Sequence, residues 1–211
     1  MKLPSIRQTF QEARTTLRRF PVVLAVAALG TVAALLLVDR EGPGGASVFY
    51  PILLAAILGI PLLTGLALLA ERRGFGRPLA LGVQLLGVLL LAGYAFTVPT
   101  DLTHAPLVTL FRFYLLAVAL HLFVAAAPFS GNGEVSGFWH YNKTLLLRLL
   151  TALLYSVVLY AGLAIALAAL DNLFGVDVPG KRYLELWILI VGVFNTWFFL
   201  AGAPDDLARL D

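Results

Sequence analysis

Residues 21–38 read PVVLAVAALGTVAALLLV and contain no charged side chain. As an α-helix, this stretch together with Phe20 would be about 28 Å long, which is close to the thickness of the hydrocarbon core of a bilayer. A cleaved signal peptide is the alternative. The apolar region is longer than such a peptide normally has, and no clear cleavage motif precedes Asp39. We therefore interpret residues 21–38 as a retained transmembrane span.

The composition of the whole chain favours the same class of protein. Of its 211 residues, 60% are hydrophobic and 13% are charged, whereas soluble domains have about 45–50% apolar and roughly 25% charged residues. The charges gather between long apolar runs, as expected when lipid is the solvent. The clustered basic residues indicate membrane orientation and contact with anionic lipid better than nucleic acid. No interleaving of aromatic and basic residues suggests a base-stacking surface, so we predict no nucleic-acid partner. Without cysteine, the chain has no disulfide and no thiolate site.

Five further apolar runs follow the first. Pro61 predicts a kink in the second run, and the fifth run is long enough to tilt or to extend beyond the bilayer. We predict an all-α, polytopic membrane protein, a bundle of six transmembrane helices. The spans are expected at residues 21–38, 48–70, 79–98, 107–127, 144–170 and 184–203, within a domain of residues 21–204.

Basic residues predict the orientation of these spans, because loops rich in Lys and Arg stay in the cytoplasm. They precede the first span and lie in the second-to-third and fourth-to-fifth connections. The opposite side carries fewer of them, namely Arg40, Lys181 and Arg182. Both termini, including the tail at residues 205–211, are therefore predicted to be cytoplasmic. The residues of the basic side are Lys2, Arg7, Arg14, Arg18, Arg19, Arg72, Arg73, Arg77, Lys143 and Arg148.

Residues 1–20 are predicted to form an amphipathic helix that lies in the membrane interface. Ser5 and Gln8 fit a capping box at its start. A frayed basic tail is the alternative. Spacings of three and four place one apolar stripe on this helix, formed by Ile6, Phe10, Ala13, Leu17 and Phe20.

Polar side chains within the spans are the first candidates for a functional site, because a central charge costs roughly 2.5–3.5 kcal/mol in the membrane. Arg112 either extends to the outer headgroups or pairs with Glu185 at a similar depth. His121 lies deeper. It is either a neutral group bonded to Asn195 or to a backbone carbonyl, or a proton-relay or ligand residue. Arg112, His121, Glu185 and Asn195 form the candidate intramembrane site.

The connection before the fifth span is a second candidate site, for an anionic headgroup. Its aromatic residues suit the membrane interface, and its basic residues suit phosphate groups. An aromatic belt with basic anchors is the alternative, but it does not require His140 and Asn142 between them. The candidate residues are Trp139, His140, Tyr141, Asn142, Lys143 and Arg148.

Motifs for enzyme chemistry are absent from the sequence. It contains no HExxH, GxSxG or P-loop pattern. The three histidines, His104, His121 and His140, fall in separate segments and do not have the spacing of a metal site. Asp101, Asp171 and Asp177 map to the outer face, where solvated loop acids are the default and a cation site is the alternative. We predict no metal and no cofactor.

Three segments resemble a bacterial multipass membrane family catalogued as domain of unknown function 4153. They are residues 138–148 (FWHYNKTLLLR), 171–177 (DNLFGVD) and 194–204 (FNTWFFLAGAP). The resemblance implies a bacterial inner-membrane protein and no known activity. Family members continue beyond the last motif, so this chain is expected to be a short relative or an N-terminal part. The matching residues are Trp139, Tyr141, Asn142, Lys143, Arg148, Asp171, Asn172, Asn195, Thr196 and Trp197.

The sequence leaves two hypotheses for function. The first is a non-enzymatic transport-related, sensory or assembly module, acting alone, as a homo-oligomer or with a partner membrane subunit. The second is a membrane-embedded enzyme or binder that acts on an anionic lipid or lipid-linked substrate from the cytoplasmic side. We favour the first, because nothing in the sequence resembles a nucleophile with its base. Both include anionic lipids of the cytoplasmic leaflet as partners.

Overall fold

The protein consists of long helices. A computed structural model describes residues 14–40, 47–129 and 135–204. Its helix content is 85%, with no strand in the part of the chain that it describes. Six helices are long and apolar enough to cross a membrane. The predicted all-α, six-span class is therefore confirmed, and the chain is a multipass membrane protein.

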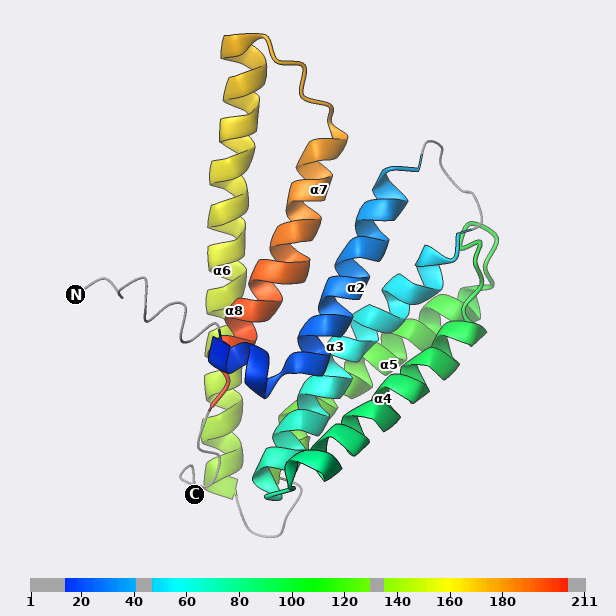
Figure 1. Cartoon of the computed structure of the whole chain (residues 1–211), viewed down its shortest axis with the longest axis vertical. Coiled ribbons are helices and arrows are strands. Elements are labelled where there is room, and N and C mark those ends of the chain that lie inside the picture. The colour runs from blue at the N-terminus through cyan, green and yellow to red at the C-terminus, as the bar shows by residue number, and fades with distance from the viewer. Residues whose placement is uncertain (1–13, 41–46, 130–134, 205–211) are drawn as a thin grey trace, which may run out of the picture.

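Successive spans run in alternating directions (Figure 1). The first five are α2 (Pro21–Val38), α3 (Phe49–Arg72), α4 (Arg77–Thr97), α5 (Leu107–Ala126) and α6 (Val135–Phe174), with a short 3-10 turn, η1 (Ala127–Phe129), after α5. The sixth span consists of α7 (Lys181–Leu189), the π-helical segment η2 (Ile190–Asn195) and α8 (Thr196–Ala201).

Helix α3 lies at the centre of the bundle and packs against α2, α4 and α5. Of the residues in the most apolar 18-residue stretch of α3, 56% are buried, whereas in the corresponding stretch of α6 only 6% are buried. Gly30 allows α2 to approach α3 closely, because a Cβ atom on Gly30 would lie 2.6 Å from the Cβ atom of Ala56. Helix α6 instead exposes apolar side chains around most of its surface, which suits contact with lipid.

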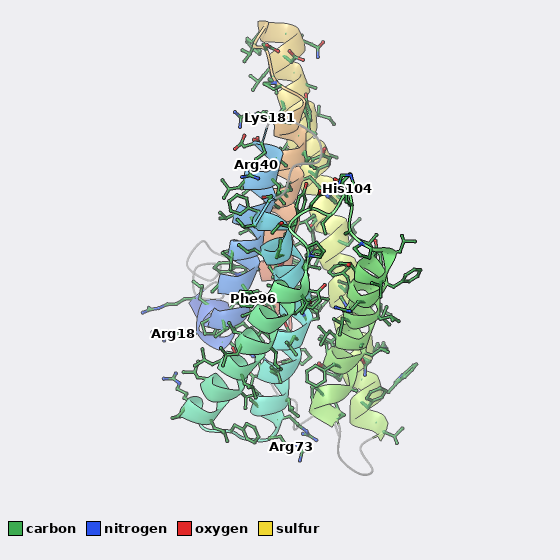
Figure 2. All side chains as sticks on the ribbon, turned by 90° about the vertical axis from the view of Figure 1, so that its right-hand side faces the viewer. Arg18, Arg40, Arg73, Phe96, His104 and Lys181 are labelled. Atoms are coloured by element: carbon green, nitrogen blue, oxygen red, sulfur yellow. The ribbon has the colours of Figure 1, made fainter. Side chains whose placement is uncertain are left out.

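Helix α6 is longer than the predicted fifth span. It has 40 residues, which corresponds to about 60 Å and to twice the thickness of the hydrocarbon core. It begins at Val135 and not at residue 144, so the predicted connection forms its first turns. His140 and Asn142 bond there to the carbonyls of Ser136 and Phe138, four residues earlier. At its other end α6 extends beyond Lys181 (Figure 2).

Arg19 joins three segments at one end of the bundle, which we call the clamp end. Its Nε and Nη2 atoms donate to the two carboxylate oxygens of Glu71, at 2.9 and 2.8 Å. Its Nη1 and Nη2 atoms also donate to the carbonyls of Ala203 and Pro204, at 2.9 and 2.5 Å. The residues before α2, the end of α3 and the end of the sixth span are thereby held together.

The described part of the predicted interfacial helix packs on protein. Residues 1–13 lie outside the described chain, and residues 14–19 are helical. Phe20, predicted to face the membrane, is completely buried among Tyr141, Phe129 and Leu200. Leu17, on the same predicted stripe, is exposed. The stripe therefore divides between the protein core and the surroundings, because Arg19 draws the last turn onto the bundle.

We expect Arg19→Met to destabilise the protein, because it leaves Glu71 and two carbonyls without their charged donor. Arg19 is only 14% exposed, and a loss of about 2 kcal/mol is expected for hydrogen bonds to a charged group. The melting temperature in detergent should fall by about 4–8 °C. Arg18→Met is the matched control, because Arg18 is exposed and points away from the bundle (Figure 2). Equal shifts for the two variants would contradict the clamp.

Candidate functional site

A cavity of about 680 Å³ lies between α2, α3 and α5 on one side and α6 and the sixth span on the other. Its volume is within the usual range for small-molecule sites. Among the described residues that line it there is no Asp, Glu, Lys or Arg. Its wall is mostly aliphatic, and the polar side chains on it are those of Thr31, Thr64, His121, Asn142, Trp187, Asn195 and Thr196.

His121 faces this cavity from α5. Its Nδ1 atom lies 2.7 Å from the carbonyl oxygen of Ala117 in the preceding turn. A carbonyl only accepts hydrogen bonds, so Nδ1 carries the proton and Nε2 is an acceptor in the neutral ring. We predicted either Asn195 or a backbone carbonyl as the hydrogen-bond partner of His121, and the partner in the structure is the backbone carbonyl.

Asn142 and its neighbour Tyr141 hold α6 against α5 at the base of the cavity. The Tyr141 hydroxyl donates to the carbonyl of Val124 at 2.9 Å, and the Asn142 amide donates to the carbonyl of Ala125 at 3.1 Å. Tyr141 is completely buried and packs against the Phe129 ring, with 5.3 Å between the ring centroids. These contacts close the α5–α6 junction next to His121.

Asn195 lines the cavity from the end of η2. The buried Ser156 hydroxyl of α6 donates to its Oδ1 atom at 3.2 Å. Gly192, in the same π-helical segment, packs on Thr31 of α2 so closely that a Cβ atom would collide with the threonine hydroxyl. Single π-helical turns within α-helices are frequent at functional sites. Here η2 brings the sixth span against both α2 and α6.

A second cavity of about 520 Å³ lies between α2, α3 and α4. Its described lining is apolar except for Thr100. Ala56 lines both cavities, so the close contact between Gly30 and Ala56 separates them. Because the first cavity carries several hydrogen-bonding side chains and the second has one, the first is the better candidate for a specific site.

The predicted ion pair between Arg112 and Glu185 is wrong. Glu185 instead bonds to Arg182 of its own helix, with 2.6 Å between Oε2 and Nη1. Arg112 is exposed on α5 and has no carboxylate partner among the described residues. The four residues of the predicted intramembrane site therefore separate, since only His121 and Asn195 line the cavity.

The predicted headgroup residues do not form one surface. Successive residues of an α-helix point about 100° apart, so this helical stretch of α6 presents its side chains in all directions. Tyr141 is buried and Asn142 faces the cavity, while the guanidinium end of Arg148 lies over Gly202 at the end of the sixth span. The remaining members are exposed, namely Trp139, His140 and Lys143.

The acidic residues at the opposite end, which we call the Lys181 end, stay apart. The Asp101 carboxylate bonds to the His104 ring at 2.8 Å, and this bond, with one from the Thr103 backbone, lowers the pKa of Asp101. Asp171 belongs to the last turn of α6, and Asp177 follows that helix. No group of three or more His, Asp or Glu within the described residues could hold a metal ion.

No family model, curated protein or solved structure matches this chain. The resemblance to domain of unknown function 4153 stays a prediction. The site is therefore defined by its geometry alone.

Some residues of the cavity were not singled out from the sequence. Thr31, Thr64 and Trp187 line it from three different helices, and each would also suit an ordinary transmembrane helix. The one sequence feature that could have pointed to this region is a glycine followed by a polar residue within a span, as at Gly30 and Thr31. It indicates a close helix contact but not a cavity.

Within the predicted headgroup stretch, we expect Tyr141→Phe to destabilise the protein and Trp139→Phe to leave its stability unchanged. Tyr141→Phe removes the buried bond to Val124, worth about 1 kcal/mol, and should lower the melting temperature by about 2–4 °C. Trp139 is 68% exposed and makes no comparable contact. Thermal unfolding of both variants in one detergent tests this. A larger loss for Trp139→Phe would show that the helix faces are assigned wrongly.

Proposed function

We propose that this chain is a bacterial inner-membrane protein, with both termini in the cytoplasm, that binds an uncharged, largely apolar molecule as a non-enzymatic module. The observation that carries the proposal is the cavity of about 680 Å³ with no charged residue on its described wall. An apolar site with a few fixed polar groups is the usual form of a small-molecule site. A transport-related, sensory or assembly role would each use such binding.

The distribution of charge supports this orientation. Six described basic residues at the clamp end are exposed: Arg14, Arg18, Arg73, Arg77, Lys143 and Arg148. At the Lys181 end, Lys181 bonds to Asp39 at 3.0 Å and Arg182 bonds to Glu185, which reduces the positive charge there. An excess of basic residues at one end favours the cytoplasmic side and contact with anionic lipid.

The second candidate is an enzyme or binder for an anionic lipid, acting from the cytoplasmic side. Exposed Trp139 and Lys143 at the clamp end favour it. They do not line the cavity, and Arg148 lies on a different face of α6. We therefore assign these residues to anchoring in the interface. The exposed apolar faces of α5 and α6 contact lipid, a second copy or a partner subunit.

Labelling of single cysteines should report the orientation, because the natural chain has no cysteine. We expect Thr103→Cys, at the Lys181 end, to react with a membrane-impermeant maleimide in intact spheroplasts. Phe75→Cys, in the exposed turn at the clamp end, should react only after lysis. The reverse pattern would contradict the proposed topology.

Native mass spectrometry of gently solubilised protein should detect a retained lipid-sized molecule. Ala34→Phe should reduce its occupancy several-fold, because Ala34 lines the cavity and the ring would occupy part of its volume. The matched control is Ala119→Phe, an equal enlargement at an exposed position of α5 that lines neither cavity. Bare protein in every mild detergent, or equal occupancy in both variants, would contradict a binding function.

A further inference from the structure

We infer that the ligand of the cavity is an uncharged lipid that carries a hydrogen-bond donor, such as a hydroxyl or an amide N–H, and that this group donates to His121, or to both His121 and Asn142 where it has two hydrogens. This inference rests on the proposed binding function and names the class of ligand. It depends on the hydrogen-bonding capacity that these two side chains retain after their contacts within the protein are made.

His121 retains one acceptor. Its Nδ1–H group is used by the carbonyl of Ala117, so the free position on the neutral ring is the lone pair of Nε2. No described residue donates to this atom. The ring lines the cavity, where a lone pair without a donor is unfavourable in an apolar wall.

Asn142 also retains an acceptor. Its amide nitrogen donates to two carbonyls, those of Ala125 and Phe138, at 3.1 and 2.9 Å. An amide nitrogen has two hydrogens, so both are used and only Oδ1 is left. No described residue donates to Oδ1, and Asn142 lines the same cavity as His121.

The two acceptors belong to the same junction between α5 and α6. Ala125, whose carbonyl binds Asn142, is four residues after His121 and lies on the same face of α5. Asn195 cannot share their ligand group, because its partner Ser156 is 14 residues beyond Asn142, or about 21 Å along α6. Leu145, Leu146 and Leu149 line the cavity between these positions, where an apolar chain would lie.

The same features disfavour an anionic ligand. Two acceptors would repel a carboxylate or phosphate, and the described lining offers no Lys or Arg to neutralise it. An unpaired charge in an apolar site is costly. An ether or ester alone would leave both acceptors without a donor. A lipid alcohol donates its one O–H group to one of the two acceptors, and a primary amide can donate to both, in neither case with a charge.

The test compares three probes of equal chain length on the full solubilised chain: hexadecanol, hexadecyl methyl ether and palmitate. We expect hexadecanol to bind about tenfold more tightly than the ether, as one additional hydrogen bond in an apolar site predicts, and palmitate to bind most weakly. In His121→Phe the preference for the alcohol should fall to about twofold or less. His140→Phe is the matched control, because His140 bonds to its own helix in the same way and lies outside the cavity.

The outcomes separate the inference from the proposed function. Equal binding of alcohol and ether, or tighter binding of palmitate, would overturn the donor requirement while the cavity remained a lipid site. The inference would also be overturned if His121→Phe kept the tenfold preference for the alcohol over the ether while His140→Phe lost it. Binding of no probe would contradict the proposed function itself. The preference of the natural chain is decisive even where a variant does not fold.

Discussion

Backbone hydrogen bonding in a medium without water is the constraint on which this structure depends. Lipid offers no partner to an N–H or C=O group, so a chain that crosses it repeatedly must be helical. The same constraint reaches the side chains. Thr31, Thr64 and His121 each bond to the carbonyl four residues earlier in their own helix. Most polar side chains in the spans therefore form their hydrogen bonds within their own helix. The few hydrogen-bonding atoms of the described residues that have no partner are the ones that could bind a ligand.

Much of the fold could be predicted because it depends on apolar length. The six spans need only runs of suitable composition, and the described helices begin and end close to most of the expected positions. The start of α6 could not be placed, because aromatic and polar residues at 138–144 are equally compatible with an interfacial loop and with a helix. The burial of Phe20 in the core could not be predicted either, because it depends on the bond between the neighbouring Arg19 and Glu71, which is distant in sequence.

The candidate site was less predictable, because it depends on how each helix is rotated. Residues close in sequence on a helix point to different sides, so the predicted headgroup cluster dispersed around α6. Arg112 and Glu185 were expected at a similar depth, but Glu185 bonds to Arg182 of its own helix. His121 and Asn195 were correctly selected as polar groups within spans. Their shared cavity could not be derived, since hydropathy contains no information about helix order.

The π-helical segment η2 has a consequence for how the last span is organised. It adds a residue to the normal turn, and each added residue rotates the remainder of the helix by about 100°. The half that carries Trp187 against Tyr160 and the half that carries Phe198 against Tyr155 are therefore set in independent registers. A regular helix would have to compromise between these two aromatic contacts. Tyr155 and Tyr160 both belong to α6 and point about 140° apart around it, so the irregular turn adjusts the two halves of one span to two sides of the same neighbouring helix.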